Sequence, residues 1–178
     1  MTIKLNCAQF IKAEIPVGHL PWISLTTKML PYNVFDVGAL HSCWEVEEGP
    51  GIIAFSTREN HVFRGASDVA DLVATIERGR KRQWKITMIE SGIIIPFKIQ
   101  NESVFEFEYR KTEYTWRREE SRNWNLTDSM DVLIAQFDKC RIALTKVGKL
   151  YFTGKGEWLE HEIIVATIRA VNMYLNDI

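Results

Sequence analysis

Residues 104–118 read VFEFEYRKTEYTWRR, and this run shows the alternation of a half-buried antiparallel sheet. Aromatic side chains alternate with glutamates from Phe105 to Tyr109, and the alternation resumes from Tyr114 to Trp116. A period of two residues is typical of a strand that buries one face and exposes the other. The run therefore predicts two antiparallel strands separated by a short break, with the rings towards the core and the glutamates towards solvent.

Further strand patterns flank this run on its N-terminal side. Residues 84–88 alternate in the same way, and 93–99 is apolar but contains Pro96, which favours a sheet edge or a bulge. Earlier still, Glu48-Gly49-Pro50-Gly51 separates an alternating segment from 52–55, which predicts a hairpin. The strands together predict an antiparallel meander.

Three segments show the spacing of helices. Residues 67–79 place Val69, Leu72, Val73 and Ile76 on one stripe, with Ser67 as N-cap and Gly79 as the residue that ends the helix. A second helix is predicted over 128–147, capped by Thr127 and ended by Gly148, and a third over 157–176.

These elements do not alternate one for one, so the sequence predicts an α+β fold rather than a doubly wound parallel sheet. We expect a mainly antiparallel, twisted sheet of about six to eight strands with the short helix and the two longer C-terminal helices packed against it. Residues 1–178 are expected to form a single domain, because no linker or repeat divides them.

The totals place the chain among ordinary globular proteins. Hydrophobic residues make up 46% and charged residues 25%, and Lys plus Arg (22) nearly balance Asp plus Glu (23). A dedicated nucleic-acid-binding protein usually carries a basic excess, which is missing here. The cysteines lack CxxC or zinc-ligand spacing, the first residues lack a signal-peptide pattern, and no apolar run approaches a membrane span. We therefore expect a cytoplasmic protein with no membrane contact.

Catalytic and cofactor motifs are missing from the sequence. It has no phosphate-binding glycine loop and no GxSxG or SxxK nucleophile motif. His161 and Glu162 suggest a metal site, but the HExxH motif would need a second histidine where Val165 stands. The sequence thus predicts no catalytic residue, no cofactor and no metal, and it favours a binding protein over an enzyme.

The candidate partner surface lies in the segment 109–124, where cations and aromatic rings are interleaved. Rings of this kind stack on bases or anchor protein interfaces, and arginine serves both. A second candidate is acidic, because carboxylates can occupy a phosphate-binding cleft and steer a basic partner. The predicted binding residues are Tyr114, Trp116, Arg117, Arg118 and Trp124, with Glu45, Glu47 and Glu48 as the acidic set.

Three functions remain open on the sequence alone. The leading hypothesis is a non-enzymatic, intracellular protein-binding module, most concretely an inhibitor or immunity protein that neutralises a bacterial toxin or nuclease domain. A second is a single-stranded nucleic-acid binder that uses the basic and aromatic segment 109–124. The third is a small-molecule-binding protein or enzyme with a pocket between sheet and helices.

Overall fold

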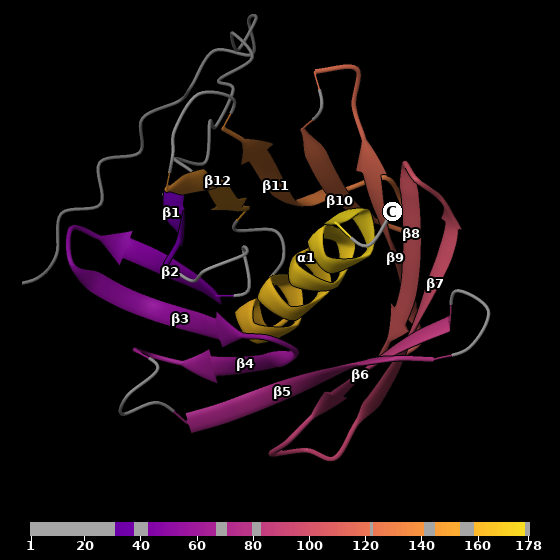
Figure 1. Ribbon diagram of the computed structural model, residues 1–178. Helices are drawn as coiled ribbons and strands as arrows, with labels where there is room; N and C mark the ends of the chain where they lie inside the picture. Colours follow the sequence, from indigo (N-terminus) through magenta and orange to yellow (C-terminus); the bar gives the residue numbers. More distant parts are fainter. Residues whose placement is uncertain are drawn as a thin grey trace, which may run out of the picture.

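The computed structural model describes residues 31–37, 43–66, 71–79, 83–121, 123–140, 145–153 and 159–176. They form a closed barrel of twelve antiparallel strands and one C-terminal helix (Figure 1). The elements are β1 Pro31–Asp36, β2 Cys43–Gly49, β3 Ile52–Arg58, β4 His61–Arg64, β5 Asp71–Arg78, β6 Gln83–Met88, β7 Ile94–Asn101, β8 Val104–Tyr109, β9 Thr112–Arg118, β10 Trp124–Asp128, β11 Leu133–Lys139, β12 Lys146–Phe152 and α1 His161–Asn176.

The strands follow one another around the ring in sequence order. Each pairs with its sequence neighbours, and β1 closes the barrel by pairing with β12, from Pro31 opposite Tyr151 onwards. Because neighbouring strands run in opposite directions, successive turns lie at alternate ends of the barrel. We call the end at which α1 begins the entry mouth, and the other end the far mouth.

Helix α1 lies inside the ring of strands (Figure 1). Its side chains are buried on every face, which is expected of a helix that is enclosed on all sides. The buried residues of α1 are Ile163, Ile164, Val165, Ala166, Thr167, Ile168, Arg169, Ala170, Val171, Asn172 and Tyr174. The helix and the inward-facing residues of the strands thus form one core.

Two polar side chains of α1 are buried with partners. The indole Nε1–H of Trp116 donates to Oγ1 of Thr167 at 3.0 Å, and the Thr167 hydroxyl donates to the carbonyl of Ile164. The guanidinium of Arg169 lies 5.0 Å from the ring centre of Trp44. Burial lowers the pKa of Arg169, while Cys43 and Asp36 act in the opposite direction.

Several predicted strands are confirmed. The predicted hairpin around Gly49-Pro50-Gly51 is the pair β2 and β3, and the aromatic run of 104–118 forms the adjacent strands β8 and β9. Pro96 lies within β7 opposite Lys85, and pairing of β7 with β8 begins one residue later, at Phe97. Proline has no N–H to donate, and Pro96 lies at a position where pairing with β8 has not begun, so this pairing loses no hydrogen bond there.

The predicted α+β class is wrong: the described chain is mainly β, with twelve strands rather than six to eight and with the final helix inside the sheet. The helix predicted over 157–176 is present as α1. The predicted layers of helices on a sheet are replaced by a sheet that closes around one helix.

The short helix predicted over 67–79 is also wrong over the residues that the structure describes. Residues 67–70 lie outside the described residues, and the rest forms strand β5. Between β4 and β5 the register shifts so that Val62 pairs with Ala74 and Phe63 with Leu72, which leaves Val73 as an extra residue. This bulge breaks the alternation and buries two adjacent residues, so the strand imitates helical spacing.

The helix predicted over 128–147 is wrong for the same reason: residues 141–144 lie outside the described residues, and the rest holds the end of β10, all of β11 and the start of β12. Leu126 pairs with Ala135 and Thr127 with Leu133, so Ile134 is the extra residue of a second bulge. Met130, which would lie on the buried stripe of that predicted helix, is instead 78% exposed in the turn between β10 and β11. A bulged strand thus accounts for both helices that the sequence predicted wrongly.

Gly148 has a different role from the helix-ending one that was predicted. It lies in β12 opposite Lys139, where a Cβ atom would collide with the carbonyl oxygen of Asp138 and lie 2.9 Å from the Phe137 ring. Glycine is therefore needed here for the close approach of two strands. Among the described residues, no helix has both the length and the apolar character that crossing a membrane requires.

Candidate functional site

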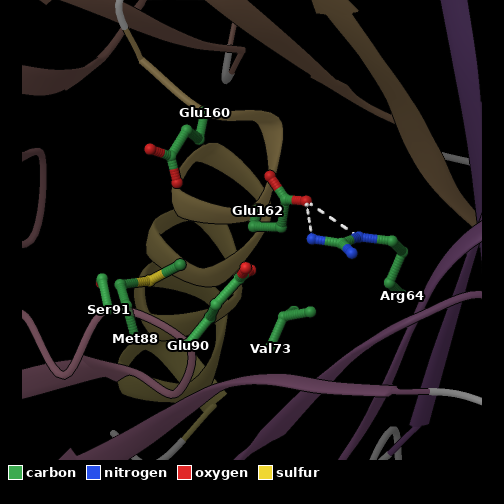
Figure 2. Close-up of a pocket in the computed structure, with 7 residues that line it drawn as sticks. All are labelled: Arg64, Val73, Met88, Glu90, Ser91, Glu160 and Glu162. Atoms are coloured by element: carbon green, nitrogen blue, oxygen red, sulfur yellow. Dashed lines mark hydrogen bonds and ion pairs between the residues drawn. The ribbon is translucent and has the colours of Figure 1, made fainter.

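A pocket of about 440 Å³ opens at the entry mouth, beside the start of α1 (Figure 2). Its volume lies within the range typical of ligand pockets, roughly 300 to 1,000 Å³. Four elements of the barrel contribute to it: the end of β4, β5, the end of β6 with the following turn, and the residues at the start of α1. The lining residues are Arg64, Val73, Met88, Glu90, Ser91, Glu160 and Glu162.

Two of the three glutamates are held in place by partners. Arg64 donates from Nε and Nη2 to Oε1 of Glu162, at 3.1 and 2.9 Å. The hydroxyl of Tyr109 and Nη2 of Arg110 both donate to Oε1 of Glu160, at 2.9 and 3.2 Å. Both carboxylates also lie at the N-terminus of α1, where negative charge is stabilised by the helix dipole. Glu160 and Glu162 therefore have a structural role in the protein itself.

Glu90 is the exception among the three carboxylates. It is exposed in the turn after β6, and no described residue donates a hydrogen bond to it or forms an ion pair with it. Its side chain rises from that turn towards the paired Glu162 and Arg64 (Figure 2). The charge of Glu90 also acts on Arg64, whose pKa is raised mainly by the hydrogen bond and charge of Glu162.

The pocket has an apolar wall as well as an acidic one. Val73 and Met88 are both buried, at 7% and 6% exposure, and they line the pocket beside Glu90. No three His, Cys, Asp or Glu side chains are arranged to hold a metal ion in the part of the chain that the structure describes. An apolar wall opposite ionised carboxylates is suited to an organic cation on an aliphatic stem.

The whole entry mouth carries an acidic excess among its described residues. The carboxylates at or near the ends of strands and in turns here are Glu48, Asp71, Glu90, Asp128, Asp131, Glu160 and Glu162. The corresponding arginines and lysines are Arg64, Arg110 and Lys111. Such an excess attracts basic ligands over a distance of about a Debye length, roughly 8 to 10 Å.

A second, smaller depression lies on the outer wall over β7, β8 and β9. Its volume is about 150 Å³, and it is lined in part by Lys98, Glu106, Glu108 and Glu113. Glu108 lies directly opposite Glu113 on the neighbouring strand, and Gln100 donates to Glu106. It is smaller than the usual range for a ligand pocket.

The structure separates the residues that the sequence singled out. The rings of Tyr114, Trp116 and Trp124 are buried, at 5%, 0% and 3% exposure, whereas Arg117 and Arg118 are exposed. The three rings belong to the core, so they are not available at the described surface to stack on a base or to contact a partner. The two arginines lie at the far-mouth end of β9.

The acidic set lies elsewhere, on β2. Glu45 and Glu47 are half-buried on the outer side of the barrel, and Glu48 is exposed near the entry mouth. Burial and then the charge of Glu48 and its hydrogen bond raise the pKa of Tyr32, which places these two side chains together. Arg118 and Glu48 thus lie towards opposite mouths, and their predicted partner-binding roles stay predictions.

Little in the sequence indicates the pocket itself. Glu90 belongs to none of the sites that the sequence predicts, and Glu162 enters only beside His161 as half of a candidate metal pair. In the structure His161 stacks on Phe152, with ring centres 4.1 Å apart, while Glu162 pairs with Arg64. The contact between Arg64 and Glu162 joins residues 98 positions apart, and no local pattern marks it.

No family model, no curated protein and no solved structure matches this chain.

Proposed function

We propose that the chain is a non-enzymatic protein-binding module whose entry pocket receives a lysine or arginine side chain of a partner protein. The observation that carries this proposal is a set of acceptor oxygens around the pocket. Both oxygens of Glu90, and Oε2 of Glu160 and of Glu162, accept no hydrogen bond from any described residue.

A basic side chain matches this set in both charge and shape. An ammonium group has three N–H donors and a guanidinium five, and hydrogen bonds between such cations and carboxylates are among the stronger ones in proteins. The methylene stem of either side chain would lie against Val73 and Met88, which are the apolar wall. One ligand group therefore satisfies both sides of the pocket.

The charge of the surrounding mouth supports the same class of partner. An acidic mouth raises the local concentration of a basic protein and accelerates its association, with a dependence on salt. An inhibitor or immunity protein that covers the basic cleft of a toxin or nuclease domain is a special case of this proposal. A nucleic acid is disfavoured, because phosphates would be repelled at this mouth and the rings of Tyr114, Trp116 and Trp124 are buried.

The proposal can be tested by panning a library of random twelve-residue peptides, displayed on phage, against the purified chain. We expect the selected peptides to be enriched in lysine and arginine relative to the starting library. The substitution Glu90→Gln removes the carboxylate that no described residue pairs with while keeping its size, and it should abolish the enrichment.

Glu113→Gln is the matched control, because Glu113 is an exposed carboxylate on the outer wall. It should leave the selected peptides unchanged. Selection of peptides without basic residues, or of the same peptides on the Glu90→Gln variant, would show that the pocket does not bind a basic side chain.

A further inference from the structure

Two isoleucines are exposed beside the pocket, on the hairpin formed by β6 and β7. Ile89 is 45% exposed and Ile94 is 58% exposed. Ile94 lies opposite Thr87, one position from the fully buried pair Ile86 and Ile95, so it faces outward from the barrel. We call Ile89 and Ile94 the apolar step.

The apolar step adjoins the pocket through the backbone. Ile89 stands between Met88 and Glu90, which both line the pocket, and its N–H donates to the carbonyl of Val73, a third lining residue, at 2.9 Å. Ile94 is on the same hairpin, across from the residue two positions before Ile89. A chain that places a side chain in the pocket and leaves it across this hairpin would pass over the step.

We infer that the partner of the entry pocket is an extended protein segment in which an aliphatic residue is a neighbour of the lysine or arginine. This inference rests on the proposed function and names its partner more narrowly. Isolated exposed hydrophobic residues are common on protein surfaces and carry no meaning alone. Here the step continues an acidic pocket that has its own apolar wall, so one ligand can cover both.

The arrangement also distinguishes a peptide from a free amine. A small aliphatic amine would fill the pocket and leave the apolar step in water. A purely apolar segment would cover the step but bring no cation to the carboxylate of Glu90, which no described residue pairs with. Only a ligand with a basic group and an adjacent aliphatic group uses both features, and a polypeptide supplies these groups at a fixed short separation.

The test compares three capped pentapeptides by NMR titration of the full chain: Gly-Leu-Lys-Leu-Gly, Gly-Gly-Lys-Gly-Gly and Gly-Leu-Gln-Leu-Gly. We expect the first to bind about tenfold more tightly than the second, because the step buries aliphatic surface. We expect it to bind about fivefold or more tightly than the third, because the pocket pairs with the ammonium group.

Two variants assign these differences to their sites. The double substitution Ile89→Ser and Ile94→Ser should remove the advantage of leucine and keep the preference for lysine over glutamine. Glu90→Gln should remove the preference for lysine over glutamine and keep the advantage of leucine. Met130→Ser, which also replaces an exposed hydrophobic residue in a turn at this mouth, should change neither preference.

The outcomes separate the inference from the proposed function. Equal affinity for the two lysine peptides, or a leucine advantage that survives the double serine substitution, would overturn the apolar step while the pocket proposal stands. Equal affinity for the lysine and glutamine peptides would overturn both. Unfolding curves of each variant should match that of the unchanged protein, because the substituted side chains are exposed.

Discussion

At the scale of single residues, the two-residue turn between β8 and β9 places side chains in an unfavourable backbone conformation. Arg110 and Lys111 have φ angles of 50° and 65°, in the left-handed region that favours glycine. Arg110 is held by its ion pair with Glu160 and by its position over the ring of Tyr109, 5.0 Å from the ring centre. Lys111 forms no ion pair or ring contact with any described residue.

We therefore expect Lys111→Gly to stabilise the protein by about 1 kcal/mol, because glycine adopts this conformation without steric cost. The free energy of unfolding in urea is the measurement. Lys85→Gly is the control: Lys85 lies in the middle of the β6 pairing, where glycine should destabilise by about 0.5 to 1 kcal/mol. Stabilisation of both variants, or of neither, would contradict the explanation from the turn.

Tyr109 should make the stability of the barrel sensitive to alkaline pH. Burial, followed by the hydrogen bond to Glu160 and the charge of that carboxylate, raises the pKa of Tyr109 above its ordinary value. A group that holds its proton more tightly when folded adds stability below its unfolded pKa, and this stability is lost as the pH rises through the folded pKa. Tyr32 and Tyr114 are shifted in the same direction.

Tyr109→Phe should accordingly flatten the loss of stability as the pH rises above about 10, since the unfolded phenol titrates near pH 10 and the folded pKa is higher. Part of the loss should remain, because the pKa values of Tyr32 and Tyr114 are raised as well. Urea midpoints measured across this range check the expectation. Parallel curves for the variant and the unchanged protein would rule out a contribution from Tyr109.

At the scale of elements, α1 is joined to the barrel wall by a buried hydrogen bond as well as by packing. Trp116 of β9 donates to Thr167 in the middle of the helix, and both residues are completely buried. Valine at 167 would keep the shape but leave the indole N–H without an acceptor. We expect Thr167→Val to destabilise by about 1 to 3 kcal/mol.

Chemical denaturation measures this effect. The control is Thr115→Val, the same substitution on the outer side of β9, where valine is well suited to a strand and no such loss is expected. A Thr167→Val variant as stable as the unchanged protein would show that the buried hydrogen bond does not hold the helix in register.

The sequence was sufficient for those elements whose pattern is regular. The alternation of 104–118, the turn at Gly49-Pro50-Gly51 and the final helix were all predicted and are present. In β5 and β11 a helix is predicted where the structure has a strand. The bulges at Val73 and Ile134 are the cause, because one extra residue converts a period of two into spacing that resembles a helix. The candidate site was less predictable, since Arg64, Glu90 and Glu162 meet only once the barrel has closed.

At the scale of the whole molecule, closure depends on two contacts between distant parts of the chain. Strands β1 and β12 pair although Tyr32 and Leu150 are far apart in sequence, and α1 fills the space that this pairing encloses. Without the helix, the inward-facing rings of Trp44, Phe97 and Phe105 would border an empty lumen. An empty apolar cavity large enough to hold a helix would cost more free energy than the marginal stability of a protein can offset.

A chain that ends at residue 158 should therefore lose cooperative unfolding and expose apolar surface. Near-ultraviolet circular dichroism and binding of a hydrophobic dye report these changes. A synthetic peptide of residues 159–178, added to the shortened chain, should restore part of the signal by filling the lumen. Cooperative unfolding of the shortened chain alone would show that the wall is stable without its helix.

The position of α1 also has a consequence for how the protein is made. The helix follows all twelve strands in the sequence, so a ribosome releases the wall of the barrel before it releases the segment that fills it. Early strands can pair locally during translation, but the ring must stay open until the helix has emerged. A nascent chain paused after β12 would then expose to solvent a row of aromatic side chains that the finished barrel buries. Chaperone demand should thus be greatest at the end of synthesis, and premature stop codons close to α1 should be as damaging as those much earlier.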